Sequence, residues 1–117
     1  MSKKPTTTRK ASAKQEKYVA TSLSGRVVSN SGATPFSKGD VTAVINEQEF
    51  IIECKTKMKE SLSLSIKKEW LEGIKNEQLA ERMDYSALVF DFGENKKTDK
   101  NQYIILDLET FKKIGGA

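Results

Sequence analysis

The sequence contains no histidine and only one cysteine, Cys54, among its 117 residues. Without histidine, three enzyme classes are excluded: nucleases with histidine-bound metals, histidine-based phosphodiesterases, and hydrolases built on a Ser-His or Cys-His pair. A lone cysteine cannot form a disulfide within the chain, which is typical of proteins in a reducing, cytoplasmic compartment. Hydrolytic chemistry in this chain would therefore have to rely on carboxylates, lysine and a metal ion.

Long apolar runs are also missing. No stretch is long enough to cross a membrane, and the N-terminal residues lack the apolar core of a signal peptide, so we expect an intracellular protein without membrane partners. The length of 117 residues and the hydrophobic content of 37% predict one domain with a modest core. No internal repeat is visible.

Acidic residues are absent from positions 1–14, which hold Lys3, Lys4, Arg9, Lys10 and Lys14. The rest of the chain holds 15 of the 20 basic residues and all 16 acidic ones, so the net charge of +4 comes from this segment. We predict that residues 1–12 form a disordered basic arm that attracts nucleic acid, followed by one folded domain over 13–117. A solubilising tail is the alternative.

Two predicted strands joined by a short polar segment carry the most informative charges. Residues 40–45 and 50–56 are rich in apolar and β-branched side chains, and the polar residues 46–49 have the length of a hairpin turn. We expect a symmetric closure with Ile45 opposite Phe50. A slip by one residue would turn the apolar side chains of the second strand towards solvent, so the register is well specified.

In that register, three charged side chains share one face. Asp40 falls opposite Lys55 and lies on the diagonal from Glu53, roughly 7–8 Å away. Two carboxylates at that separation can bind Mg²⁺, which prefers carboxylate oxygens and keeps several waters. Such an ion polarises a phosphoryl oxygen and acidifies a bound water, and Lys55 could position that water or stabilise developing charge. The alternative is a solvated charged face, but the apolar run before these residues favours a site.

Three segments, Ser31-Gly32-Ala33, Lys38-Gly39-Asp40-Val41 and Ile52-Glu53-Cys54-Lys55, resemble the signature of the PD-(D/E)xK nuclease superfamily. More narrowly, they resemble archaeal-type and phage Holliday junction resolvases, over about residues 16–92. One departure is that Pro35 does not directly precede Asp40.

The resemblance implies an α/β fold with a restriction-endonuclease-like core. Its mixed five-stranded sheet would be flanked by helices in the order α-β-β-β-α-β-β. It also implies a Mg²⁺-dependent endonuclease, with Mn²⁺ able to substitute, that cuts branched DNA such as a four-way junction. A symmetric homodimer is implied as well, because resolving a junction needs two cuts.

The resemblance adds Glu16 to the catalytic set of Asp40, Glu53 and Lys55. The expected metal ligands are Asp40, Glu53 and the backbone carbonyl of Cys54, with Glu16 as a further candidate. A carboxylate near a helix N-terminus is the alternative reading of Glu16. The predicted DNA-binding residues are basic or lie in a Ser-Gly loop: Lys3, Lys4, Arg9, Lys10, Lys14, Arg26, Ser31, Lys38 and Lys57.

The remaining elements follow from periodicity and from capping residues. We predict a helix over 13–24, a strand over 26–29, a helix from Ser63 or Ser65 to Met83, strands over 87–92 and 102–106, and a short terminal helix. The long helix should bury a stripe that includes Trp70, which we interpret as a core residue. Gln78 on the same stripe is a further site candidate, or the point where the stripe reaches solvent.

Two alternatives to a resolvase stay open. One is a different nuclease of the same fold, of the nicking, repair or restriction type. The other is a DNA-binding module without catalysis, although Asp40, Glu53 and Lys55 are all present.

Overall fold

The computed structural model describes residues 8–28 and 40–116. Its helices are α1 (Thr8–Ser22), α2 (Lys68–Glu81) and α3 (Leu108–Gly115), with a short 3-10 helix, η2 (Asp99–Asn101). Its strands are β1 (Arg26–Val27), β2 (Val41–Ile45), β3 (Gln48–Thr56), β4 (Tyr85–Asp91) and β5 (Tyr103–Ile105). The predicted α/β class and order of elements are confirmed.

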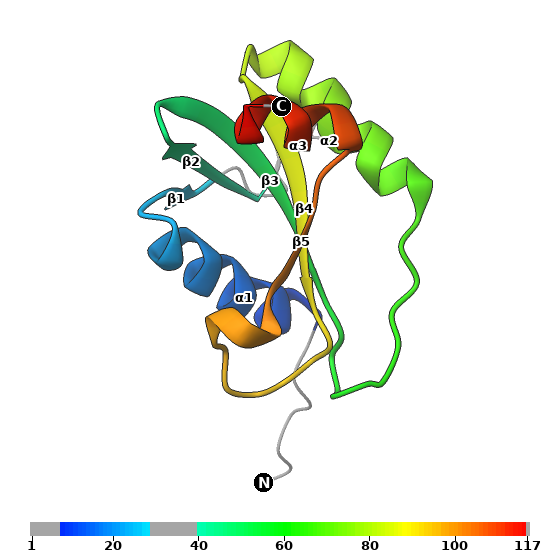
Figure 1. Ribbon diagram of the computed structural model, residues 1–117. Helices are drawn as coiled ribbons and strands as arrows, with labels where there is room; N and C mark the ends of the chain where they lie inside the picture. The colour runs from blue at the N-terminus through cyan, green and yellow to red at the C-terminus, as the bar shows by residue number, and fades with distance from the viewer. Residues whose placement is uncertain (1–7, 29–39, 117) are drawn as a thin grey trace, which may run out of the picture.

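The five strands form one mixed sheet in the order β1-β2-β3-β4-β5. The pair β3 and β4 is parallel, and every other neighbouring pair is antiparallel. Parallel neighbours need a crossover connection, and α2 supplies it on one face of the sheet (Figure 1). The predicted order α-β-β-β-α-β-β places a helix between the third and fourth strands, and α2 lies there.

The β2–β3 hairpin closes more tightly than the sequence predicted. Ile45 pairs with Gln48 rather than with Phe50, and the turn consists of Asn46 and Glu47 alone. Both turn residues have positive φ, 53° and 66°, as a two-residue hairpin turn of the favoured hand requires. The predicted register was wrong by two residues. A shift of two keeps every side chain on its predicted face, because side chains alternate with a period of two.

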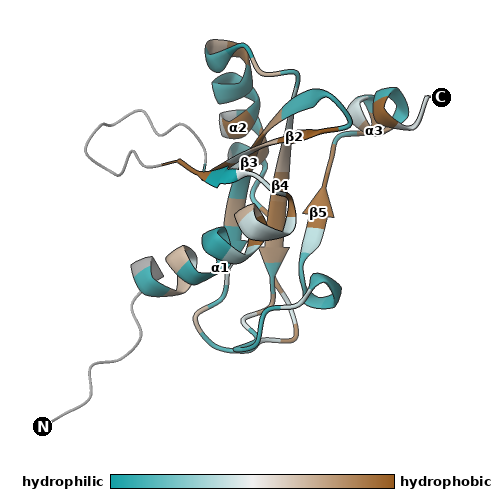
Figure 2. Ribbon diagram, turned by 90° about the vertical axis from the view of Figure 1, so that its left-hand side faces the viewer, coloured by the Kyte–Doolittle hydropathy of each residue, from teal (hydrophilic) through white to brown (hydrophobic). Residues whose placement is uncertain are grey.

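The apolar side chains of β3 separate onto two faces. Phe50, Ile52 and Cys54 pack against α1, where Val19 and Ala20 complete the cluster. Ile51 projects to the other face, together with Leu88 of β4, and both side chains are fully buried. Helix α2 packs on β3 and β4, and its residue Ile74 is buried. In Figure 2, most of β4 has the colour of hydrophobic residues, whereas much of α2 has the colour of hydrophilic ones.

Both long helices begin elsewhere than predicted. Helix α1 starts at Thr8, so residues 8–12, which were assigned to the basic arm, belong to the helix. Good helix formers such as Arg9, Lys10 and Ala11 explain the longer helix. Helix α2 starts at Lys68, and Lys67 precedes it without a side-chain cap.

The serines predicted to cap α2 lie in an irregular segment before it. There the Ser61 hydroxyl donates to the Ser63 carbonyl at 2.9 Å and accepts from the Ser63 amide at 3.3 Å. Such local bonds compete with helix formation.

Candidate active site

The two neighbours of β3 differ in length, and this creates the candidate site. Strand β2 pairs with β3 only as far as Ile52, whereas β4 pairs with it as far as Thr56. Within the described strands, the last residues of β3 therefore have no neighbour on their β2 side. The Asp40 carboxylate takes that place, because its Oδ2 accepts the Cys54 amide at 2.7 Å. Asp40 is thus fixed by a backbone group at the end of the hairpin.

Glu16 reaches the same place from α1. Its carboxyl group shares a hydrogen bond with the Asp40 carboxyl group, and Glu53 lies close enough to repel it. Burial, the negative charge of Asp40, that hydrogen bond and the charge of Glu53 together raise the pKa of Glu16 to about 7. The structure therefore brings together all three acids that the sequence proposed.

The other two carboxyl groups are also perturbed. Burial raises the pKa of Asp40, and the Cys54 amide, Lys55 and Glu16 offset only part of that rise. Burial and then the charge of Asp40 raise the pKa of Glu53, against the opposing effect of Lys55. Lys55 Nζ lies 3.3 Å from Glu53 Oε2, and both side chains are partly exposed. Carboxylates that repel one another in a partly exposed site provide what a hard cation needs.

The donor set fits a magnesium ion that keeps part of its water shell. In the ranges 8–28 and 40–116, no group of three or more His, Cys, Asp or Glu side chains is arranged to hold a metal ion. Mg²⁺ is often held by only one or two carboxylates and several waters, and the two carboxylates of Asp40 and Glu53 match that chemistry. The Cys54 thiol is not a candidate ligand, because burial and the neighbouring carboxylates raise its pKa far above the ordinary value. Only the Cys54 carbonyl remains available.

A buried polar network beside the site was missed by the sequence analysis. Asp91, at the end of β4, is fully buried and accepts hydrogen bonds from Thr56 Oγ1, the Gly93 amide and Gln102 Nε2. It also pairs with Lys97 Nζ at 3.0 Å. Burial raises the pKa of Asp91, but these hydrogen bonds outweigh burial and hold the pKa below its ordinary value.

This network holds α1 in place. Gln15, next to Glu16, is fully buried and donates to the Val89 carbonyl at 3.3 Å and to Gln102 Oε1 at 3.2 Å. One turn later, the Tyr18 hydroxyl donates to Asp99 at 2.5 Å. The helix that carries Glu16 is therefore anchored by polar bonds as well as by the core. An acid that ends an apolar strand was the sequence signal for Asp91.

Two residues of α2 differ from their predicted roles. Gln78 is buried at the C-terminal end of α2, where its amide donates to the carbonyls of Met83 and Asp84 at 3.3 and 2.9 Å. Gln78 therefore provides hydrogen bonds to the backbone just after α2, and it is not part of the group formed by the three acids. Trp70 is only partly buried, and its ring lies 4.6 Å from Lys55 Nζ. The interpretation of Trp70 as a core residue holds in part, because the side chain is half-buried but its ring also lies beside a charged group.

Several of the predicted DNA-binding residues come together in one hollow. Lys10 and Lys14 of α1 and Lys57, which follows β3, line a cavity of about 310 Å³ together with Lys97. Lys14 Nζ donates to the Asn95 carbonyl at 2.8 Å. Arg26 lies apart from this group and lines another hollow beside β2. Lys3, Lys4, Ser31, Lys38 and the side chain of Arg9 lie outside the described residues.

The arrangement of sheet and helices occurs in a solved structure of a nuclease. Hjc, a Holliday junction resolvase from the archaeal hyperthermophile Archaeoglobus fulgidus, matches this chain with a TM-score of 0.55. This chain shares the overall fold of that protein. The match covers 80% of this chain and 85% of the other, at 16% sequence identity, so the likeness establishes the fold alone. No protein-family model matches the sequence, and no curated protein matches it.

Proposed function

We propose that this protein is a metal-dependent endodeoxyribonuclease of the PD-(D/E)xK type that cuts branched DNA, as a Holliday junction resolvase does. The observation that carries the proposal is the convergence of Glu16, Asp40, Glu53 and Lys55 at the free end of β3. A resolvase fold supports the proposal independently. The proposed location is intracellular, where Cys54 stays reduced.

Asp40 and Glu53, with the Cys54 carbonyl, would hold Mg²⁺ or Mn²⁺, and Glu16 would complete the acidic site. The bound ion would polarise the phosphoryl oxygen and lower the pKa of a coordinated water. Glu16, a carboxylate beside Asp40, would accept a proton from the attacking water, and the oxygen released from the bridging P–O bond would take a proton from solvent. The Lys55 ammonium would stabilise the charge that develops on the phosphoryl oxygens.

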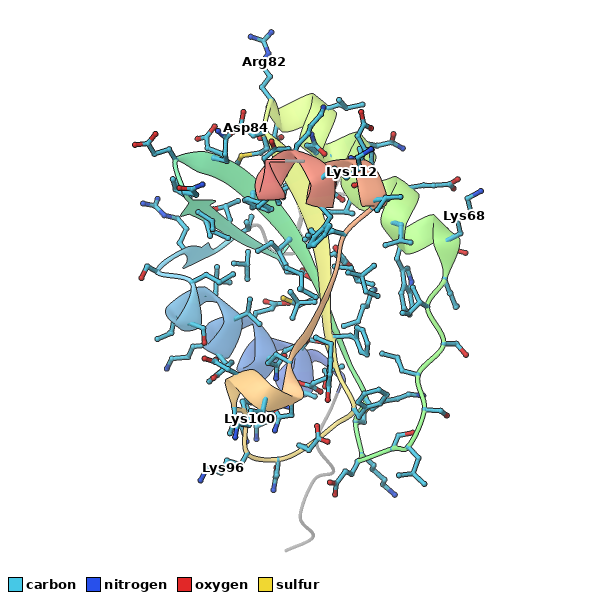
Figure 3. The ribbon with its side chains drawn as sticks, in the orientation of Figure 1. Lys68, Arg82, Asp84, Lys96, Lys100 and Lys112 are labelled. Atoms are coloured by element: carbon cyan, nitrogen blue, oxygen red, sulfur yellow. The ribbon has the colours of Figure 1, made fainter. Side chains whose placement is uncertain are left out.

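The basic hollow supports DNA as the substrate. Lys10 and Lys14 precede Glu16 on α1, Lys57 follows Lys55 directly after β3, and all three line the hollow. Lys96 and Lys100 project outwards from the segment after β4 at the same end of the molecule (Figure 3). Contacts of this kind bind phosphates and position DNA without reading its sequence. Lys3 and Lys4 of the arm would extend the surface.

A symmetric homodimer would place two such sites on one junction. Strand β5 is an edge of the sheet, and with α3 it exposes apolar side chains: Ile104 at 53%, Leu108 at 74%, Phe111 at 61% and Ile114 at 38%. We call these four residues the β5–α3 surface and propose it as the dimer contact. Apolar patches of this kind mark interaction sites. Phe111→Glu should convert a dimer into a monomer in light scattering, and an unchanged mass would contradict the assignment.

Cleavage assays on four labelled DNAs would test the proposed function. The substrates are a four-way junction, a flap, a linear duplex and a single strand, each with Mg²⁺ or with EDTA. We expect paired cuts in the junction with Mg²⁺ only. Preferred cutting of linear duplex or flap would favour a restriction or repair nuclease. Junction binding without any cut would favour a DNA-binding module.

A further inference from the structure

We propose that Trp70 is a positioning residue that fixes the Lys55 ammonium at the candidate site through a cation–π contact. Lys55 Nζ lies 4.6 Å from the centroid of the Trp70 ring and 3.3 Å from Glu53 Oε2. Both distances are within the range of direct electrostatic attraction. The inference rests on the proposed nuclease function, because it assigns Trp70 a task in that site.

The fold explains why these two side chains meet. Phe50, Ile52 and Cys54 pack against α1, so the alternation of β3 turns Glu53 and Lys55 towards the face that α2 covers. Trp70 is the third residue of α2, so its ring extends from the first turn of that helix to the end of β3. Four rotatable bonds leave the ammonium of a lysine mobile unless contacts restrict it. Glu53 and Trp70 supply two such contacts.

The surroundings of the ring are unlike those of a packing residue. One turn further along α2, Ile74 is 3% exposed and belongs to the core, whereas Trp70 is only partly buried. A second ammonium, that of Lys67, lies 5.9 Å from the same centroid. The face of an indole ring attracts ammonium groups at these distances, so the ring can hold a lysine side chain in one position. Lys67 is exposed and precedes α2, which makes it a matched control for Lys55.

Small errors in the position of a catalytic group cost large factors in rate. If Trp70 fixes Lys55, Trp70→Leu should lower kcat for junction cleavage by roughly tenfold and leave KM nearly unchanged. Trp70→Phe keeps an aromatic face and should restore most of the rate. Trp70→Leu should have little further effect when Lys55 is already alanine, because both changes remove the same placed charge. Lys67→Ala should cut at the wild-type rate.

Fluorescence provides a readout that does not depend on activity. Trp70 is the only tryptophan in the chain, so its emission reports on its own surroundings alone. Lys55→Met removes the nearer cation and should change the emission spectrum clearly, whereas Lys67→Ala should change it less. An unchanged spectrum in Lys55→Met would overturn the contact. This comparison uses native Trp70, so it holds even if Trp70→Leu fails to fold.

The outcomes separate this inference from the proposed function. If the wild-type protein cuts junctions and a folded Trp70→Leu cuts them equally fast, the positioning role is overturned and the nuclease remains. A rate loss that Trp70→Phe does not rescue would also overturn it, because an aromatic face would then not be what matters. If the wild-type protein cuts no DNA with Mg²⁺, the proposed function and this inference fall together.

Discussion

Replacing Glu16 by glutamine should make the metal-free protein more stable at pH 8 while it abolishes cleavage. Glu16 is held among like charges, and its pKa rises from 4.5 to about 7. Between these two values the native state binds more protons than the unfolded state, so stability must fall as pH rises. The loss is complete above pH 7, where the folded protein carries an unfavourable charge that glutamine lacks.

The size of the effect follows from the shift. A pKa difference of about 2.5 units corresponds to roughly 3.4 kcal/mol if no solvent screens the charge. Glu16 is only partly buried, so screening reduces this figure to about 1–2 kcal/mol. At pH 4.5 the protonated Glu16 shares a hydrogen bond with Asp40 that glutamine replaces imperfectly, so the variant gains nothing there.

Urea unfolding in EDTA at pH 4.5 and at pH 8 measures both quantities. We expect wild-type and Glu16→Gln proteins to differ little at pH 4.5 and the variant to be the more stable at pH 8. Glu72→Gln is the control, because Glu72 is an exposed carboxylate on α2 whose partner is Lys68, at 3.9 Å. A wild-type stability that does not fall between these pH values, or a variant less stable at pH 8, would refute the reasoning.

Three further outcomes are expected. Mg²⁺ at one hundred times its Kd for the protein should add about 2.7 kcal/mol to the free energy of unfolding of the wild-type protein, and so raise its thermal midpoint. The midpoint of Asp40→Asn should not change. Asp91→Ala should destabilise the protein by roughly 3–5 kcal/mol in urea unfolding, because it leaves the ammonium of Lys97 buried without its partner; a loss below 1 kcal/mol would contradict the role of this network. Lys14→Gln should weaken the binding of all DNA shapes alike, and on duplex DNA it should reduce the slope of log binding constant against log salt concentration by about 0.9. Lys112 lies on α3, at the opposite end of the molecule from Lys96 (Figure 3), so Lys112→Gln should change neither the affinity nor the slope.

The hairpin shows what the sequence could predict and what it could not. The alternation of side chains along β3 predicted Glu53 and Lys55 on one face and Cys54 on the other. A shift of the β2–β3 pairing by two residues leaves these faces unchanged. The turn length was not predictable in the same way. Asn46 and Glu47 adopt positive φ, which is ordinary for asparagine but uncommon for glutamate, so the composition of 46–49 fitted a longer turn better.

The site was predictable where it depends on strand alternation and on motif spacing, and not where it depends on tertiary packing. Glu16 was proposed from resemblance, and the structure brings it to Asp40 because α1 lies across that end of β3. Trp70 and Gln78 share one helical stripe in the sequence. Their different roles follow from what stands opposite each of them, Lys55 in one case and the carbonyls after α2 in the other. Periodicity records only the face of the helix.

Junction cleavage by the Asp40→Asn variant tests the central claim most directly. Asparagine keeps the shape of Asp40 and an oxygen that can accept the Cys54 amide, but it removes the charge that would hold the metal ion. We predict that the wild-type protein cuts a four-way junction with Mg²⁺ and not with EDTA, and that Asp40→Asn binds the junction at least as tightly without cutting it. Near-native cleavage by Asp40→Asn would contradict the account.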